Sequence, residues 1–83
     1  MSAYCYILYT QKLDKYYVGS TPDLVRRLDE HNRGKDKFTG TDMPWLLVYH
    51  ETFRELKEAR QREYYIKKQK SRKYIEGLIA QPK

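Results

Sequence analysis

Two apolar segments joined by a short polar turn constrain the fold more than any other part of the chain. Residues 4–9 are rich in Tyr, Ile and Leu, and the polar residues 11–15 separate them from a second strand-like segment, YYVGS, at 16–20. Two strand-like runs with a short polar connection predict an antiparallel β-hairpin. Gly19, near the end of the second run, allows another group to approach the backbone closely.

A helix is expected directly after this hairpin. Thr21 is a suitable N-cap, the proline after it fits the first helical position, and Gly34 is a suitable terminator. The side chains expected to form its core-facing stripe are Leu24, Val25 and Leu28.

Arg27 and His31 of this helix are four residues apart, so they are neighbours on its surface. At 100° per residue, His31 falls within about 20° of the direction of Leu24, which places the imidazole at the edge of the buried face. Tyrosine hydroxyls on the hairpin and a guanidinium on the next helix can together hold a phosphodiester. This part of the chain lacks only a carboxylate to hold a metal ion.

The next segments complete a small α+β domain. Residues 35–44 predict a loop, and residues 45–50 predict a third strand. The near-continuous apolar run at 45–48 indicates a strand covered on both faces, with helices on both sides of the sheet. The expected fold is a three-stranded antiparallel sheet flanked by about three helices, in the order β-β-α-β-α-α, as a single domain over residues 1–83.

Two helices are expected after the third strand. Thr52 followed three residues later by Glu55 is a capping-box pattern, which predicts a helix that ends near Lys68. Ser71 is a suitable N-cap for a last helix over 72–80. The residues expected to face inward from this last helix are Ile75, Leu78 and Ile79.

One carboxylate interrupts the apolar stripe of the second helix. Leu56, Ala59 and Ile66 lie on this stripe, and Glu63 lies among them within about 80° of the helix circumference. A carboxylate at such a position breaks the apolar pattern, and it is usually paired, metal-bound or catalytic because an unpaired buried charge costs several kcal/mol. The pattern also allows a carboxylate that reaches solvent, or a salt bridge with Arg27.

Composition favours an anionic partner. Lys and Arg number 17 against 11 Asp and Glu, a net charge of +6 that favours nucleic acid over a membrane surface. The nine tyrosines offer stacking faces and hydroxyls to nucleic acid, although packing in a sheet is their ordinary role. The single cysteine, Cys5, excludes an internal disulfide and a multi-cysteine zinc site, and favours a buried thiol in a reducing compartment. No window approaches the roughly 20 apolar residues of a membrane span, so a cytoplasmic protein is expected.

At these positions the chain resembles the GIY-YIG nuclease superfamily, in particular its stand-alone members. The first signature tripeptide appears as Tyr4-Cys5-Tyr6, with the glycine and the isoleucine replaced, and the second as Tyr17-Val18-Gly19. The family's arginine lies ten residues after the second tyrosine, here Arg27, and its histidine lies four further on, at His31. The segment WLLVYHETFRELKEARQREYYIKKQK is similar to the family's third strand and metal-binding helix, and the metal-ligand glutamate falls on Glu63.

The resemblance implies a metal-dependent endonuclease that hydrolyses DNA phosphodiester bonds, with a role in repair or in processing branched or damaged DNA. Tyr6 and Tyr17 would place or deprotonate the attacking water, with Tyr6 favoured as the base and Tyr17 as the alternative. Arg27 would neutralise charge on the scissile phosphate, and His31 would assist the base. Glu63 would bind one divalent ion, Mg²⁺ or Mn²⁺.

A module of this kind would hold nucleic acid, DNA in preference to RNA, on its own basic surface. The residues expected to contact it are Gly19, Arg26, Lys37, Arg62, Lys67 and Lys68. A protein partner or a homodimer is also compatible with the pattern. Two other functions remain open: a nucleic-acid-binding module that is catalytically weak or active only with a partner, and a structural or protein-interaction role.

Overall fold

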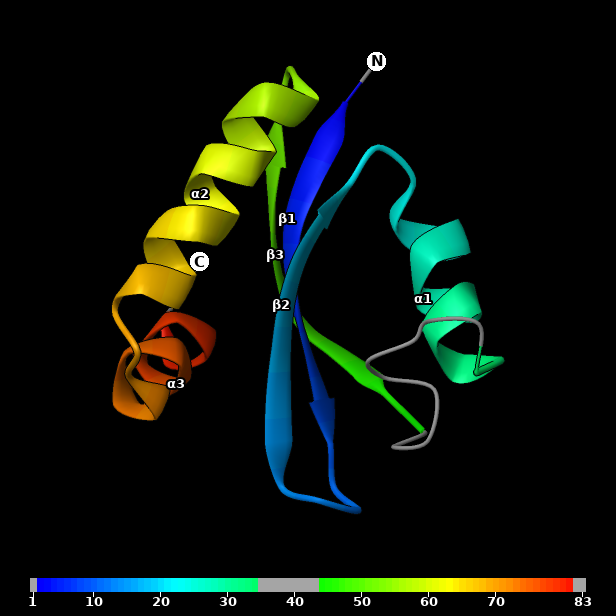
Figure 1. Ribbon diagram of the computed structural model, residues 1–83, viewed down its shortest axis with the longest axis vertical. Coiled ribbons are helices and arrows are strands. Elements are labelled where there is room, and N and C mark those ends of the chain that lie inside the picture. Colours follow the sequence, from blue (N-terminus) through cyan, green and yellow to red (C-terminus); the bar gives the residue numbers. More distant parts are fainter. Residues whose placement is uncertain (1, 35–43, 82–83) are drawn as a thin grey trace.

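The computed structural model describes residues 2–34 and 44–81 of the chain, and it has the expected α+β architecture (Figure 1). Its elements follow the predicted order β-β-α-β-α-α. They are β1 (Ala3–Thr10), β2 (Lys15–Thr21), α1 (Leu24–Asn32), β3 (Leu46–Phe53), α2 (Leu56–Lys68) and α3 (Arg72–Ala80). Within the described ranges, none of the helices combines the length and the apolar character needed to cross a bilayer.

The strands form one antiparallel sheet in the order β2-β1-β3, so the central strand is β1. As predicted, β3 sends side chains to both faces of the sheet, with Val48 packing in one core and Leu47 in the other. β3 is an edge strand whose first residue, Leu46, is largely exposed, whereas β1 is buried along most of its length. The predicted strand begins one residue too early, because Trp45 precedes β3 and packs under α1, where the Asn32 side chain accepts from its backbone N–H at 2.6 Å.

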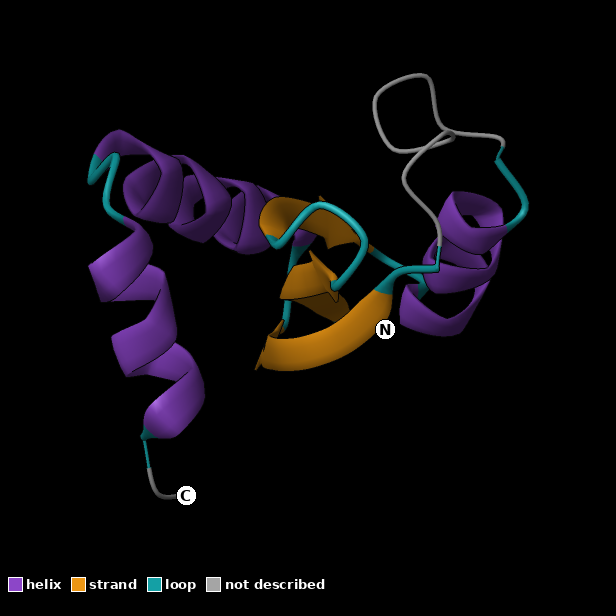
Figure 2. Cartoon of the chain, turned by 90° about the horizontal axis from the view of Figure 1, so that it is seen from below, coloured by secondary structure: helices purple, strands orange, loops and turns teal. Residues whose placement is uncertain are grey.

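Helices cover both faces of the sheet, as predicted. Figure 2 shows α1 on one side of the strands, with α2 and α3 on the other. Alternate residues of β1 therefore enter two separate cores: Cys5 and Ile7 pack with Ile66 and Leu78, while Tyr6 packs on the α1 side. The expected burial of the Cys5 thiol is confirmed.

Two of the three predicted helix starts are wrong, and both errors have one cause. Tyr4 of the central strand pairs with Thr21 on one side and with Thr52 on the other, so the sheet holds both threonines in extended conformation. The N-caps are instead Asp23, whose carboxylate accepts from the Arg26 backbone N–H at 3.1 Å, and Glu55, which forms a capping box with Glu58.

The faces of the helices largely follow the predicted stripes. Val25 is an exception, because it is 82% exposed, while Leu24 and Leu28 pack against the sheet as expected. Gly34 ends α1 with a left-handed φ of 74°, and Ser71 caps α3 by accepting from the Tyr74 backbone N–H. The residues expected to face inward from α3, namely Ile75, Leu78 and Ile79, pack against the core. The predicted loop lies outside the described residues except for its last residue.

Candidate active site

Tyr6 and Tyr17 lie side by side on the α1 face of the hairpin. Tyr6 pairs with Gly19 across the β1–β2 ladder, and Tyr17 precedes Gly19 by two residues, so all three share one face of the sheet. The two tyrosine rings are 6.4 Å apart between centroids. A Cβ at residue 19 would lie 2.5 Å from the Tyr6 hydroxyl oxygen and 3.1 Å from Cε2 of Tyr17. The group that approaches this glycine is therefore the Tyr6 side chain.

His31 lies deeper than the edge position predicted for it. The helical spacing from Leu24 turns it toward the sheet, and its Nε2 shares a hydrogen bond of 3.0 Å with the Tyr6 hydroxyl. Tyr6 and His31 are 1% and 0% exposed, and the Tyr17 ring packs edge-on to the imidazole at 5.0 Å. Burial raises the pKa of Tyr6 above its usual range, although a hydrogen bond with Arg27 acts in the opposite direction.

Arg27 lies one helical turn before His31 and reaches the same hydroxyl. Its Nη1 also donates to Glu30 Oε1 at 3.2 Å, and its side chain stays partly exposed. A guanidinium that contacts a buried tyrosine on one side and remains accessible on the other can present N–H groups to an incoming anion.

Glu63 approaches β2 from the α2 side. Ser20 Oγ donates to Glu63 Oε1 at 2.5 Å, and Lys67 Nζ donates to Oε2 at 2.6 Å. The carboxylate is thus paired, with its side chain 21% exposed, and the salt bridge that it makes is with Lys67. This pairing explains how a charged residue is accommodated on the apolar stripe of α2.

The free edge of β2 brings the two sides of the site together. β2 is an edge strand between α2 and α1 (Figure 1), so no further strand separates Glu63 from the tyrosines. The negative charge of Glu63 contributes to the raised pKa of Tyr6, and the Lys67 ammonium lies 5.9 Å from the centre of the Tyr17 ring. Four of the predicted catalytic residues therefore form one contact cluster on the α1 side, namely Tyr6, Tyr17, Arg27 and His31. Glu63 lies on the α2 side of β2 and is linked to Tyr17 through Lys67.

The chemistry of Glu63 fits one largely hydrated divalent ion. Mg²⁺ takes oxygen ligands, and it usually keeps several waters and binds one or two protein carboxylates. Within residues 2–34 and 44–81, no three His, Cys, Asp or Glu side chains come together as a metal cluster. A site with four protein ligands, as structural zinc requires, is therefore not formed by this part of the chain.

Several cations predicted to contact nucleic acid are engaged within the protein. Arg62 forms a two-pronged interaction with Glu51, at 3.0 and 3.1 Å, which ties α2 to β3. Arg26 pairs with Glu30 at 3.3 Å, and Lys67 with Glu63. Lys68 is exposed, and Lys37 lies outside the described residues.

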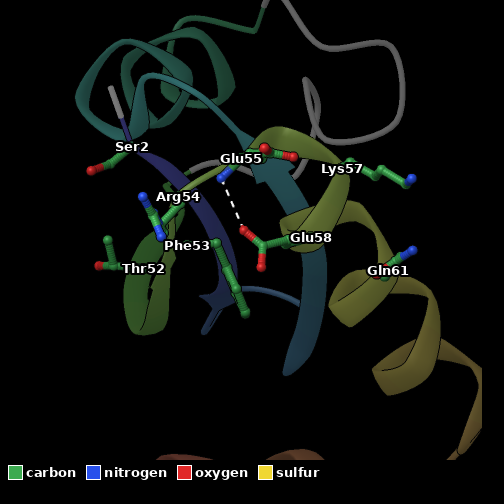
Figure 3. Close-up of a pocket in the computed structure, with 8 residues that line it drawn as sticks. All are labelled: Ser2, Thr52, Phe53, Arg54, Glu55, Lys57, Glu58 and Gln61. Carbon is green, nitrogen blue, oxygen red and sulfur yellow. Dashed lines mark hydrogen bonds between the residues drawn. The ribbon is translucent and has the colours of Figure 1, made fainter.

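Two grooves differ in their relation to these residues. One, of about 780 Å³, lies at the junction of β3 and α2 beside the Glu55–Glu58 capping box, and none of the five predicted catalytic residues lines it (Figure 3). The other, of about 440 Å³, lies between β2 and the α2–α3 junction. Its lining includes Tyr16, Tyr17, Ile66, Lys67, Lys70 and Arg72. Because Tyr17 and Lys67 belong to it, this second groove is continuous with the site.

The sequence did not predict the contact between Ser20 and Glu63, or the groove. Ser20 directly follows the glycine of the second tripeptide, and its neighbours on alternate positions of β2 face α2, so strand periodicity could have placed it opposite Glu63. The groove depends on how α3 packs against β2, which no local pattern specifies.

Known proteins resemble this chain over most of its length. The family model of the GIY-YIG catalytic domain matches residues 2–75. The UPF0213 protein YazA of Bacillus subtilis is 42% identical over 69 residues, which cover 78% of this chain and 70% of that protein. The UPF0213 protein SpyM3_1077 of Streptococcus pyogenes is 42% identical over 80 residues, covering 94% and 85%.

A solved structure agrees with the fold. The solution NMR structure of the UPF0213 protein BH0048 from Bacillus halodurans is 36% identical, with a TM-score of 0.59 over 96% of this chain and 84% of that one. Because the GIY-YIG catalytic domain model matches residues 2–75, this protein belongs to the GIY-YIG family of nuclease-type domains.

Proposed function

We propose that the protein is a divalent-metal-dependent endonuclease that hydrolyses phosphodiester bonds in DNA. The observation that carries the proposal is the buried 3.0 Å hydrogen bond between Tyr6 and His31, with Tyr17 and Arg27 in contact with this pair and Glu63 across β2. A core that needed only packing would not need a histidine and a tyrosine hydroxyl in this pairing. Each polar group instead matches one requirement of phosphodiester hydrolysis.

We assign the two tyrosines different tasks. Tyr6 is 1% exposed and its raised pKa keeps the hydroxyl protonated, so it is poorly placed to meet water and is not available as a base. Tyr17 is less buried and lines the groove, so we assign contact with the attacking water to its hydroxyl. The Tyr6–His31 pair packs against the Tyr17 ring and fixes its position. As the water oxygen bonds to phosphorus and the bond to the leaving oxygen breaks, we assign the water's proton to solvent at the partly exposed Tyr17 hydroxyl, and solvent returns a proton to the leaving oxygen.

Arg27 and Glu63 supply charge from opposite sides of the strand. The guanidinium of Arg27 can donate two parallel hydrogen bonds to the scissile phosphate, which neutralises charge as it develops. Ser20 orients the Glu63 carboxylate, which would hold the metal ion. When bound, such an ion polarises the phosphate and lowers the pKa of its coordinated water.

The groove between β2 and the α2–α3 junction provides a path for the nucleic acid strand. Lys67 and Lys70 lie along it, and Arg72 stacks over Tyr16 at 5.0 Å. Cations along a groove that opens beside the catalytic residues attract the phosphate backbone without reading sequence. We expect weak, strongly salt-dependent binding, and branched or damaged DNA as the substrate class.

A cleavage assay tests the proposal. Labelled branched, nicked, single-stranded and duplex DNA, and a matched RNA, are incubated with the protein and Mg²⁺ or Mn²⁺. We expect metal-dependent cleavage of at least one DNA substrate, with losses of 10²-fold or more, on the order of a missing charge-stabilising group, for Arg27→Ala and Glu63→Ala. Equal cleavage by the wild type and both variants would refute the proposal.

A second candidate is nucleic-acid binding without efficient catalysis, or catalysis only beside a partner. The observation that favours it is that both carboxylate oxygens of Glu63 accept hydrogen bonds from the protein's own side chains. Salt-dependent binding with no turnover across the metals and substrates above would support this candidate over the first.

A further inference from the structure

Lys67 occupies one side of the Glu63 carboxylate, which is the proposed metal ligand. The two residues are one helical turn apart on α2, and the Lys67 ammonium donates to Glu63 Oε2 at 2.6 Å. Ser20 holds the other oxygen, so the carboxylate is fixed from both sides. Oε2 therefore already has a positively charged partner within the chain, which is the Lys67 ammonium.

A divalent ion and this ammonium cannot both take the same position. The ion would need an oxygen that the ammonium contacts at hydrogen-bond distance, and the two cations would repel each other at a separation of a few ångströms. The ammonium is tethered to the same helix, so it acts at a high effective concentration. Metal binding must then displace Lys67 or act against its charge.

The structure also indicates where a displaced Lys67 ammonium would find another anion. Lys67 lines the groove between β2 and the α2–α3 junction, and its ammonium lies 5.9 Å from the centre of the Tyr17 ring. A phosphate in the groove beside Tyr17 would offer it negative oxygens. Nucleic acid and metal would then favour each other's binding, because the phosphate attracts the group that competes with the metal.

We propose that Lys67 is a positioning residue that holds Glu63 in the free protein and competes with the divalent ion for the same oxygen, so that metal binding is strengthened by nucleic acid. This inference rests on the proposed function, because it takes Glu63 as the metal ligand. It assigns Lys67 a role beyond that of a surface cation that contacts DNA.

Mn²⁺ binding to the free protein tests the competition. Free Mn²⁺ is measured from its electron paramagnetic resonance signal during titration of the wild type and the variants Lys67→Gln, Lys67→Arg and Lys57→Gln. We expect Lys67→Gln to bind Mn²⁺ about 3- to 10-fold more tightly, since one nearby positive charge is removed. Lys57→Gln removes the same charge from an exposed position on the same helix, and it should stay within about 2-fold of the wild type, as should Lys67→Arg.

Lys67→Arg keeps a cation beside the partly buried Glu63, and circular dichroism with urea unfolding checks that Lys67→Gln is folded under the titration conditions. Unchanged or weaker Mn²⁺ binding by Lys67→Gln would overturn the inference while leaving Glu63 as the metal ligand. The variant Glu63→Gln separates the two questions. If it binds Mn²⁺ as the wild type does, the proposed metal site fails, and the inference fails with it.

A cleavage-resistant phosphorothioate oligonucleotide tests the link to nucleic acid. We compare the factor by which saturating oligonucleotide raises the Mn²⁺ affinity of each protein. We expect this factor to be about 3- to 10-fold larger for the wild type than for Lys67→Gln, because only the wild type has a competing ammonium to lose. The same increase in both proteins would contradict the proposed link.

Discussion

The substitution Gly19→Ala probes the close packing on which the candidate site depends. The new methyl group would lie 2.5 Å from the Tyr6 hydroxyl oxygen, 2.6 Å from Cζ of the same ring, and 3.1 Å from Cε2 of Tyr17. All three distances are shorter than the roughly 3.5–4.0 Å at which carbon atoms pack favourably. Both rings, or the strand itself, would therefore have to move.

The Tyr6 ring has little freedom to move. It is 1% exposed, and any retreat lengthens the 3.0 Å hydrogen bond to His31. Forcing an extra methyl group into a packed core costs about 1–3 kcal/mol, and we expect this loss of stability for Gly19→Ala. We also expect a loss of cleavage larger than the fraction unfolded explains, because both tyrosine hydroxyls shift.

A control with the opposite expected sign exists in the same chain. A Cβ at Gly77, which lies exposed within α3, would meet nothing within 4 Å. Gly77→Ala should therefore raise stability by about 0.5–1 kcal/mol, since alanine is the better helix former. Urea unfolding followed by circular dichroism measures both variants, and NMR follows the imidazole signals of His31.

The outcome that would refute the packing argument is specific. In that outcome, the free energy of unfolding of Gly19→Ala lies within about 0.5 kcal/mol of the wild-type value, the range of an ordinary surface substitution, and the NMR signals of His31 are unchanged. That result would mean that the Tyr6 ring does not lie over residue 19.

Three further predictions concern buried polar and charged groups. Tyr6→Phe should cost about 1–3 kcal/mol in urea unfolding, because it removes the hydroxyl partner of the buried His31 nitrogen; a stability equal to that of the wild type would contradict the hydrogen bond. Partial burial raises the pKa of Glu51, but hydrogen bonds from Arg62 outweigh burial and hold this pKa below its ordinary value of 4.5. The ionised carboxylate therefore adds stability above about pH 4.5 that is lost as pH falls through the lower folded pKa, and Glu51→Gln should flatten this part of a stability–pH profile measured by urea unfolding. Burial raises the pKa of Cys5 to about 12, so a thiol reagent at pH 8 should modify it only at the rate of unfolding, and rapid modification of folded protein would contradict its placement.

The order of the elements could be predicted from the sequence, but the arrangement of the strands could not. Strand periodicity, polar turns and helix caps are local, and they gave β-β-α-β-α-α. Which strand is central depends on pairing between distant segments, and no local pattern in the sequence specified it. The helix starts failed for a similar reason, since pairing with Tyr4 kept Thr21 and Thr52 in the sheet.

The candidate site was predictable where a residue's position along an element decides its direction. Helical spacing turned His31 toward the hairpin, and the break in the apolar stripe singled out Glu63. The partners of individual cations could not be predicted, because Arg62, Lys67 and Lys68 have similar local surroundings in the sequence. Only the fold shows that Arg62 of α2 pairs with Glu51 of β3, and that Lys67 pairs with Glu63.

A crystal soaked with Mn²⁺ tests the central claim most directly. We expect an anomalous peak bonded to Glu63 at about 2.0–2.3 Å, with water completing the coordination and the Lys67 ammonium moved away from Oε2. The same soak of Glu63→Gln crystals should give no peak at this position. A Glu63 still held by Ser20 and Lys67 in a crystal of protein that cleaves DNA, with Mn²⁺ bound elsewhere, would contradict the account.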